Sequence, residues 1–466
     1  MVAERVEDLD IETYVAHQQQ KQLLRFLTCG SVDDGKSTLI GRLLHDSAQI
    51  YDDQLATLKQ ESAKIGNAGE ALDLALLVDG LQAEREQGIT IDVAYRYFSS
   101  QKRKFIIADT PGHEQYTRNM ATGASTCDVA VILIDARYGV QTQTKRHAYI
   151  ASLLGIKHLV IAINKMDLVD YQQSVFDAIR TDFEQFAKQL RAADIRYIPL
   201  SALTGDNVVA TSKHMPWYTS EPLLTALEDI DIDSEHHEFR FPVQYVQRPD
   251  LNFRGFSGTV ASGSISVGDE ITVLPSDKSS VIASIVTFDG DKSMATKGEA
   301  ITLVLEDEID ISRGDVIVKS QDISPTSAQQ ITAELVWMQE TPLKLNQLYD
   351  VKVAGKLTQV KMTSIEYITD VNTLDKRVES TVSLNTIAKV KMAFTEPMFV
   401  ETYRDNHTTG AMIIIDRLTN ATAAAVMVTE VKSQKKLEQV YSESEIELNA
   451  WVRKTYPHWQ ALDISK

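Results

Sequence analysis

Eight consecutive residues near the N-terminus have the types and spacing of a phosphate-binding loop. The run Gly30-Ser31-Val32-Asp33-Asp34-Gly35-Lys36-Ser37 fits the pattern G-x-x-x-x-G-K-[ST], and Thr38 follows it. Glycines permit the backbone angles that turn N–H groups inward around phosphates, and a helix that starts here adds positive potential. Lys36 can reach the β- and γ-phosphates, and the Ser37 hydroxyl can ligate Mg²⁺. The run therefore predicts a nucleoside triphosphate site, with a chance match in an ordinary turn as the alternative.

A second short motif, Asp109-Thr110-Pro111-Gly112, fits the pattern D-x-x-G. An acidic residue at the end of a strand can hold Mg²⁺, commonly through a water molecule. A glycine such as Gly112 leaves its N–H free to face a γ-phosphate. Alone, such a motif is usually a turn.

The third motif, Asn164-Lys165-Met166-Asp167, would choose the base. The carboxylate of Asp167 can accept two hydrogen bonds from the ring N–H and the exocyclic amine of guanine, a pair that adenine does not offer. A charge-assisted hydrogen bond contributes roughly 1.5–3 kcal/mol, so a preference for guanine follows. Asn164 would brace the loop and the stem of Lys165 would cover the ring. The backbone amides of Ser201-Ala202-Leu203 could support the guanine oxygen.

These motifs need elements that bring them together. Short apolar runs that alternate with helical patterns predict a parallel sheet covered on both faces. Each motif follows one of the predicted strands, and ligands of such sheets bind at the carboxyl ends of the strands. The predicted strands are Leu23–Cys29, Lys104–Ala108, Val129–Ile134, His158–Ile163 and Ile195–Leu200, and the predicted helices include Lys145–Leu154 and Gln172–Leu190.

The pattern changes near residue 230, where short β-type segments separated by turn residues begin. Examples are Phe241–Val246, Gly258–Gly263 and Gly268–Pro275. We expect an α/β P-loop GTPase domain, with a parallel-rich sheet and helices on both faces, followed by two β-barrel domains. The expected limits are an N-terminal arm at 1–22, the GTPase domain at 23–230, barrels at 238–322 and 328–432, and a C-terminal helical tail at 441–466.

Composition narrows the function classes. The chain has 466 residues and a formal net charge of -18, which makes it a poor candidate for nucleic-acid binding. It has two cysteines, Cys29 and Cys127, so a disulfide scaffold is not supported, and Cys29 is expected to be a small buried strand residue. No signal peptide and no membrane-length apolar run is evident. We expect a cytoplasmic protein that binds no membrane.

The run Gly88-Ile89-Thr90-Ile91-Asp92 resembles the translation-factor class of GTPases. By that resemblance, Thr90 ligates Mg²⁺ only when the γ-phosphate is present, and His113 positions the attacking water. Val32 and Ile89 match the apolar pair that gates this histidine, and Asp33 matches an acid that assists a charge-compensating cation. No motif identifies an arginine finger.

Longer runs make the resemblance narrower. The chain resembles the GTPase (large) subunits of bacterial heteromeric sulfate adenylyltransferases. The runs that carry this resemblance are Leu76–Gly88, Asp109–Ser125, Phe241–Val246 with Arg248-Pro249 and Phe253–Phe256, and Asp416–Asn420. The resemblance implies that GTP hydrolysis is coupled to the synthesis of adenylyl sulfate (APS) and pyrophosphate from ATP and sulfate. It also implies a smaller partner subunit that binds ATP and sulfate, and a separate APS kinase downstream.

Two alternatives stay open at this point. One is a translation factor similar to elongation factor 1-alpha that delivers aminoacyl-tRNA, which the net charge disfavours. The other is a non-catalytic scaffold that uses GTP as a structural ligand, which the presence of Lys36, Thr90, Asp109 and His113 disfavours.

Overall fold

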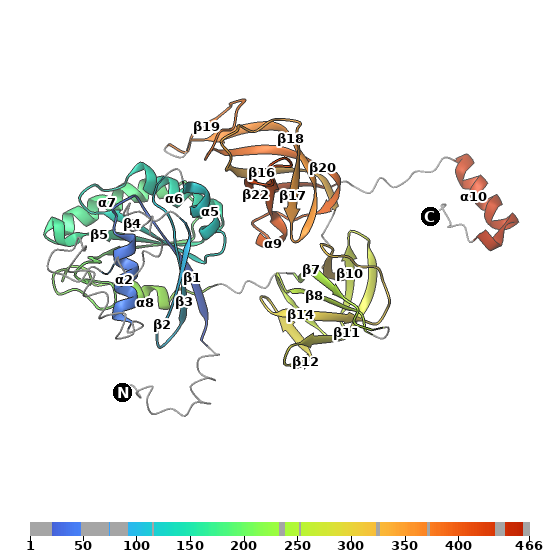
Figure 1. The fold of residues 1–466 in the computed structure, drawn as a ribbon, viewed down its shortest axis with the longest axis horizontal. Coiled ribbons are helices and arrows are strands. Elements are labelled where there is room, and N and C mark those ends of the chain that lie inside the picture. Colours follow the sequence, from blue (N-terminus) through green and yellow to red (C-terminus); the bar gives the residue numbers. More distant parts are fainter. Residues whose placement is uncertain are drawn as a thin grey trace.

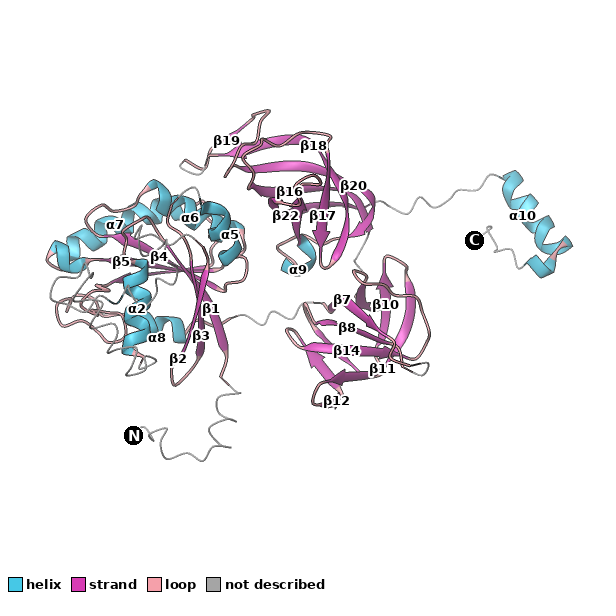
Figure 2. Ribbon diagram, viewed as in Figure 1, coloured by secondary structure: helices cyan, strands magenta, loops and turns pink. Residues whose placement is uncertain are grey.

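The computed structural model describes most of the chain in three bodies and a separate helix (Figure 1). The described residues are 21–47, 74, 92–113, 116–232, 238–250, 253–322, 327–370, 373–433 and 443–459. An α/β domain comes first, and two antiparallel barrels follow it (Figure 2). In the part of the chain so described, no helix is both long and apolar enough to cross a membrane.

The α/β domain is built on a six-stranded sheet with the order β2-β3-β1-β4-β5-β6. All neighbours pair in parallel except β2, which is antiparallel to β3 at one edge. The carboxyl ends of the parallel strands therefore meet along one edge, where the predicted motifs follow. The strands are β1 (Leu23–Cys29), β2 (Ala94–Ser99), β3 (Lys104–Asp109), β4 (Val129–Asp135), β5 (His158–Asn164) and β6 (Asp194–Pro199).

Helices cover both faces of this sheet and form two separate cores. One core packs α2 and α8 against the sheet, and the other packs α5, α6 and α7 against the opposite face. Every residue of β4 is buried, as expected for a strand covered on both faces. The helices are α2 (Lys36–Asp46), α5 (Thr117–Ala124), α6 (Thr142–Leu153), α7 (Gln173–Ala187) and α8 (Leu223–Glu228), with a short 3-10 helix η4 (Met166–Val169).

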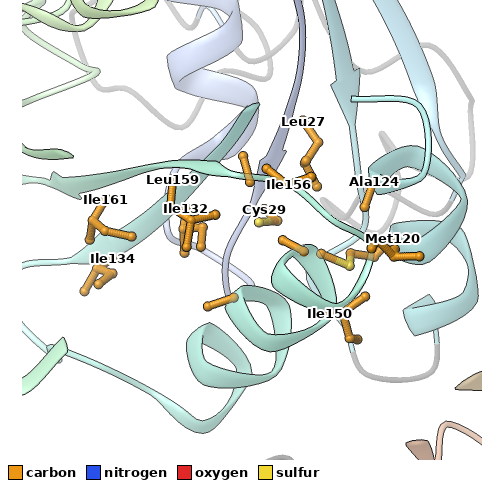
Figure 3. Close-up of a cluster of buried hydrophobic side chains, with 14 of the residues drawn as sticks. Leu27, Cys29, Met120, Ala124, Ile132, Ile134, Ile150, Ile156, Leu159 and Ile161 are labelled. Carbon is orange, nitrogen blue, oxygen red and sulfur yellow. The ribbon is translucent and has the colours of Figure 1, made fainter. Parts of the chain in front are cut away.

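Cys29 lies in the core beneath α5 and α6, among Leu27, Ile132 and Met120 (Figure 3). Its side chain is fully buried, and burial raises the pKa of the thiol to about 12. The thiol is therefore uncharged at neutral pH and packs as a small apolar group. The prediction of a buried strand residue is confirmed.

Each barrel is a ring of six strands in which the first and last strands pair. The first ring runs β10-β15-β7-β8-β14-β11, and the second runs β17-β21-β22-β16-β20-β18. The first barrel contains β7 (Arg240–Gln247), β8 (Gly255–Thr259), β9 (Ser264–Ser266), β10 (Glu270–Leu274), β11 (Lys278–Thr287), β12 (Gly290–Lys292), β13 (Met294–Thr296), β14 (Ala300–Leu305) and β15 (Val316–Lys319). The second contains β16 (Ser327–Trp337), β17 (Leu348–Val353), β18 (Lys356–Thr369), β19 (Lys376–Arg377), β20 (Ile387–Phe399), α9 (His407–Gly410), β21 (Ala411–Ile415) and β22 (Thr422–Ser433).

The second barrel packs against the α/β domain. Its residues Val336, Met338 and Tyr403 join the hydrophobic core beneath α6. The Tyr403 hydroxyl donates to the backbone oxygen of Leu154 at 2.9 Å, directly after α6 ends. Arg191 also pairs with the buried carboxylate of Glu334 at 3.2 Å. These contacts fix the second barrel on the face of the sheet that α6 covers.

The two barrels are joined through Arg240, whose side chain is only 3% exposed. Its guanidinium lies 2.8 Å from Glu401 of the second barrel and also pairs with Glu238 and Asp322. A second polar contact runs from the amide of Asn406 to the Ser262 hydroxyl at 3.0 Å. A buried cation shared by three carboxylates holds the barrels in one arrangement.

The expected fold class is confirmed, and the main differences lie in the elements that carry few local signals. The edge strand β2 and helix α5 were not predicted, and helix α6 begins at Thr142 and not at Lys145. The predicted strand Gly258–Gly263 is wrong in its limits, because β8 ends at Thr259 and β9 begins only at Ser264. The domain limits given above stay predictions.

A helix α10 (Glu443–Thr455) and a short 3-10 helix η5 (Pro457–Trp459) end the described chain. This confirms the predicted C-terminal helix. Leu448 and Trp451 of α10 are 60% and 54% exposed.

We expect Arg240→Met to destabilise the paired barrels by about 3 kcal/mol, because it removes one partner of a buried ion network and leaves carboxylates facing an apolar side chain. Urea unfolding followed by circular dichroism measures the loss. Arg248→Met is the matched control: Arg248 is 49% exposed and pairs with Glu308 at 3.7 Å, so its loss should change stability by less than about 0.5 kcal/mol. Equal stability of both variants would contradict the bridging role of Arg240.

Candidate nucleotide site

The loop between β1 and α2 has a backbone that depends on its glycines. Gly35 has φ 91° and Asp33 has φ 67°, both in the left-handed region. A Cβ on Gly35 would lie 2.5 Å from the Asn164 amide nitrogen, and one on Gly30 would lie 2.8 Å from the Leu133 backbone oxygen. A side chain at either glycine therefore requires the neighbouring strand or loop to move. The loop leads into the first turn of α2, where Lys36, Ser37 and Thr38 present their N–H groups.

Lys36 is the buried cation of this loop, with 7% of its surface exposed. Its Nζ donates to the backbone oxygens of Ser31 at 2.8 Å and Gly30 at 3.3 Å. Burial lowers the pKa of Lys36, while the charges of Asp109 and Asp34 act in the opposite direction. The ammonium group is thus turned inward, over the loop that the glycines shape.

The loop after β3 comes close to Lys36. A Cβ on Gly112 would lie 2.6 Å from Lys36 Nζ and 2.8 Å from the Gly30 oxygen, so only glycine fits there. Asp109 ends β3, is 2% exposed, and accepts a hydrogen bond from the Thr28 hydroxyl at 3.2 Å. The D-x-x-G motif and the phosphate-binding motif therefore form one site, as their places after neighbouring strands predict.

Asn164 connects three loops with one side chain. Its amide nitrogen donates to the Asp34 backbone oxygen at 2.8 Å, and its amide oxygen accepts from the Ala202 backbone N–H at 2.9 Å. Asn164 is 1% exposed and ends β5. Both ends of the amide are satisfied, so this residue fixes the Ser201–Leu203 loop at a set distance from the first loop.

Asp167 carries a polar atom that the described residues leave unsatisfied. Its Oδ1 is buried and has no hydrogen-bond partner among them. A buried acceptor without a partner costs about 1–3 kcal/mol, so it needs an explanation. Nearby, Lys165 has φ 63° and donates to the Asp33 backbone oxygen, which brings the third motif against the first. An acceptor in this position suits a ligand that offers N–H donors.

Three residues that support these loops were not identified from sequence: Asp135, Arg42 and His147. Asp135 ends β4, is 2% exposed, and pairs with Arg137 at 2.7 Å and with Lys165 at 3.0 Å. Burial alone would raise the pKa of Asp135, but hydrogen bonds from Arg137 and Lys165 outweigh it and lower the pKa. Arg42 of α2 donates to the backbone oxygens of Ala202 and Leu203. An acid that ends a fully apolar strand is the signal that could have identified Asp135.

His147 supports the first loop and was not identified from sequence. It lies in α6, is fully buried, and its Nδ1 accepts the Gly30 backbone N–H at 3.1 Å. Burial, with a contribution from Lys36, lowers the pKa of His147 to about 3. The ring is therefore neutral at physiological pH, as an acceptor at Nδ1 requires. A histidine inside a helical pattern carries no local sign of this contact.

Of the remaining predicted site residues, some lie in or beside the first loop and two lie outside the described residues. Val32 and Asp33 lie on the exposed side of the first loop, and the Asp34 carboxylate caps the Ser31 N–H at 2.5 Å. Burial raises the pKa of Asp34 to about 6. His113 follows Gly112, is half-buried, and meets Tyr116 edge-on at 6.1 Å between ring centroids. Thr90 and Ile89 lie outside the described residues.

Comparison with family models agrees with two parts of this architecture. Residues 21–232 match the family described as elongation factor Tu GTP binding domain. Residues 330–429 match the family described as GTP-eEF1A C-terminal domain-like. These ranges correspond to the α/β domain and the second barrel.

Relatives match the chain over nearly its whole length. A protein of Shewanella oneidensis named sulfate adenylyltransferase subunit 1 is 62% identical, over 100% of this chain and 97% of its own. A protein of the same name from Teredinibacter turnerae is 59% identical, over 98% of each chain.

Among solved structures, the GTPase-like domain of Ski7 from S. cerevisiae, bound to GTP, has a similar fold. The TM-score is 0.50 with 18% identity, over 91% of this chain and 100% of that one. At this identity the likeness concerns the fold alone.

The neutral state of His147 predicts a pH dependence of stability. The unfolded chain takes up a proton below about pH 6.5 while the folded chain does not until about pH 3, so stability is complete above pH 6.5 and is lost as pH falls. Between pH 7.5 and 5.5 this loss is about 1.4 kcal/mol. His147→Asn, whose amide oxygen can take the place of Nδ1, should not show it, and urea unfolding at both pH values measures the difference.

Asp34 titrates in the same range with the opposite sign, because its raised pKa favours the folded state as pH falls. It is present in both proteins, so its effect cancels in the comparison. Identical pH slopes for the two proteins would contradict a buried neutral His147.

Proposed function

The chain belongs to the sulfate adenylyltransferase subunit 1 family, and on that premise we propose that it is the GTP-hydrolysing regulatory subunit of a sulfate adenylyltransferase. It couples GTP hydrolysis to the formation of APS and pyrophosphate from ATP and sulfate. The observation that carries this proposal is the similarity to relatives named sulfate adenylyltransferase subunit 1 over nearly the whole chain. The loops around Lys36 and Asp167 agree with it. APS contains a high-energy mixed anhydride, so its synthesis is uphill and needs a coupled reaction.

Guanine nucleotide binding follows from the loops described above. The residues from Gly30 to Thr38 surround the phosphates with backbone N–H groups, and Lys36 turns its ammonium group from loop oxygens to phosphate oxygens. Asp167 Oδ1 accepts from the guanine edge, which supplies the partner that the described residues do not. Asn164 and the stem of Lys165 hold the base, and the amides of Ser201, Ala202 and Leu203 face its oxygen.

Magnesium would be held by the Ser37 hydroxyl, by Asp109 directly or through water, and by Thr90 when the γ-phosphate is present. Oxygen ligands of this kind, few in number and completed by water and phosphate, suit Mg²⁺. When bound, the metal neutralises charge on the β- and γ-phosphates.

Hydrolysis needs a water molecule in line with the γ-phosphate. His113 follows Gly112, where an added Cβ would lie 2.6 Å from Lys36 Nζ, and this proximity supports a role for His113 at the γ-phosphate. His113 orients this water, Val32 and Ile89 gate its approach, and Asp33 assists a charge-compensating cation. Lys36 and Thr90 stabilise the charge that develops on the phosphate oxygens.

The partner is a smaller subunit that binds ATP and sulfate, and a separate APS kinase acts downstream. The name "subunit 1" of the relatives supports a heteromeric enzyme. The same relatives disfavour the alternative of a translation factor that delivers aminoacyl-tRNA, and the net charge of -18 agrees. The protein acts in the cytoplasm, where both nucleotides are available.

The guanine assignment predicts that Asp167→Asn shifts nucleotide preference from GTP to xanthosine triphosphate, because an amide can donate to the oxygen that replaces the exocyclic amine. We expect GTP affinity to fall at least tenfold, the loss of a charge-assisted hydrogen bond. Equilibrium titration with fluorescent analogues of both nucleotides measures the change. Asp170→Asn, on an exposed acid three residues later, is the control and should bind GTP as the wild type does. Unchanged GTP affinity in Asp167→Asn would remove this residue from base recognition.

The coupling proposal is tested with the native complex, obtained by co-purification of both subunits. We expect GTP to increase the rate of APS formation from ATP and sulfate, and we expect His113→Ala to keep GTP binding while it lowers GTP hydrolysis by orders of magnitude. GTP-stimulated APS formation should fall in parallel. His458→Ala, on the exposed η5 segment, is the control for loss of a histidine. APS formation that ignores GTP would defeat the coupling, and normal turnover in His113→Ala would exclude this histidine.

A further inference from the structure

A cavity lies where the α/β domain and the two barrels meet. Its volume is about 260 Å³, and all three bodies contribute lining residues, among them Gly155, Lys157, Ser262, Lys297, Arg404 and His407. The α/β residues come from the amino ends of β4 and β5, opposite the edge that carries the nucleotide loops. The short helix α9 stands on the side of the second barrel that faces the other two bodies (Figure 1).

We propose that this cavity binds a small multivalent oxyanion, such as sulfate or pyrophosphate, and that the bound anion holds the three bodies together. The proposal concerns a site separate from the nucleotide loops. It rests on one cation from each body: Lys157 from the α/β domain, Lys297 from the first barrel and Arg404 from the second.

Charge in the cavity is the reverse of the charge of the molecule. The chain carries a formal net charge of -18, yet the lining has three cations and two carboxylates, Asp128 and Asp405. Each carboxylate already has a partner in its own body. Asp128 accepts from the Arg25 backbone N–H at 2.9 Å, and Asp405 accepts from the Thr402 hydroxyl at 2.6 Å. Both carboxylates keep their charge beside these neutral donors, so three cations against two carboxylates leave an excess of one positive charge, with the histidines taken as neutral.

Lys297 and Arg404 are well placed to take a new anionic partner. Both are exposed, and within the described ranges neither forms an ion pair. Lys297 lies near enough to Asp128 for its charge to affect that carboxyl group across the gap between two bodies. Three like charges from separate bodies repel each other, and an oxyanion between them turns that repulsion into attraction.

The walls of the cavity are polar and fixed. Asn406 is 7% exposed, donates to the Ser262 hydroxyl at 3.0 Å, and accepts from the Thr408 and Thr409 backbone N–H groups. His407 stacks on Tyr403 with 4.3 Å between ring centroids, and a Cβ on Gly155 would lie 2.6 Å from its Nε2. These contacts hold the wall residues in place, so the binding of an anion has to order only the side chains of the cations.

The class of ligand follows from size and charge. A cavity of this volume that is lined by one cation from each body suits a compact anion with several oxygens. Sulfate and pyrophosphate share this chemistry, and they are substrate and product of the reaction under Proposed function. Either would report the state of that reaction to the junction of the three bodies.

The test is isothermal titration calorimetry of the full chain in excess GDP without added divalent metal, so that the nucleotide loops are filled. Sulfate and pyrophosphate are titrated in separate arms against chloride at equal ionic strength. We expect saturable binding of sulfate, of pyrophosphate or of both. The anion that binds with the higher affinity is the one for which the cavity is suited. Lys297→Gln and Arg404→Gln should each weaken binding at least tenfold.

Lys213→Gln removes the same charge from an exposed lysine away from the cavity, so it should bind as the wild type does. Absence of saturable binding in both arms, or equal affinity in all variants, would overturn the proposal. GDP affinity is measured on the same samples. Loss of GDP binding would speak against the proposed function, whereas normal GDP binding without oxyanion binding would speak against this site alone.

Discussion

The candidate nucleotide site depends on the burial of one ammonium group. Lys36 is almost fully enclosed, and removal of a charge from water costs several kcal/mol unless hydrogen bonds and opposite charges offset that cost. Two loop oxygens and the carboxylates of Asp109 and Asp34 supply the offset. These partners can surround the lysine only if Gly30 and Gly112 bring their backbones within contact distance of it. The glycines, the acid at the end of β3 and the lysine are therefore one electrostatic unit.

The loops that carry Asn164–Asp167 and Ser201–Leu203 are joined to this unit by short polar contacts. Asn164 spans from the Asp34 oxygen to the Ala202 N–H, and Lys165 reaches both Asp135 and the Asp33 oxygen. The same side chains therefore contact the loop after β1 and the two loops after β5 and β6. Asp167 is the exception, since the described residues leave its buried oxygen without a partner.

Sequence was most informative where chemistry and local structure coincide. The parallel strands and their loops were predictable because each buried apolar run is followed directly by a polar residue of a known motif. Asp109 ends β3 and Asn164 ends β5. His147 and Arg42 were not predictable, because each acts through a tertiary contact more than 100 residues away in the chain. The edge strand β2 pairs on one side only and its burial is partial, so its pattern was too weak to identify. The interface of the barrels was not predictable for the same reason as His147. Nothing in the sequence around Arg240 indicates that it pairs with Glu401, which is distant in the chain.

Helix α6 and the residue that follows it contact both the first loop and the second barrel. Near its middle, His147 accepts the Gly30 N–H of the phosphate-binding loop, and just after its last residue the Leu154 oxygen accepts the Tyr403 hydroxyl of the second barrel. Seven residues of helix span about 10 Å, so a rigid rod of two turns separates these contacts. Gly155 and Lys157, which follow, line the cavity between the three bodies. A displacement of the phosphate-binding loop that moves α6 along its axis must therefore either break the Tyr403 contact or carry the second barrel with it. Two hydrogen bonds at fixed places along one helix therefore connect the first loop to the second barrel.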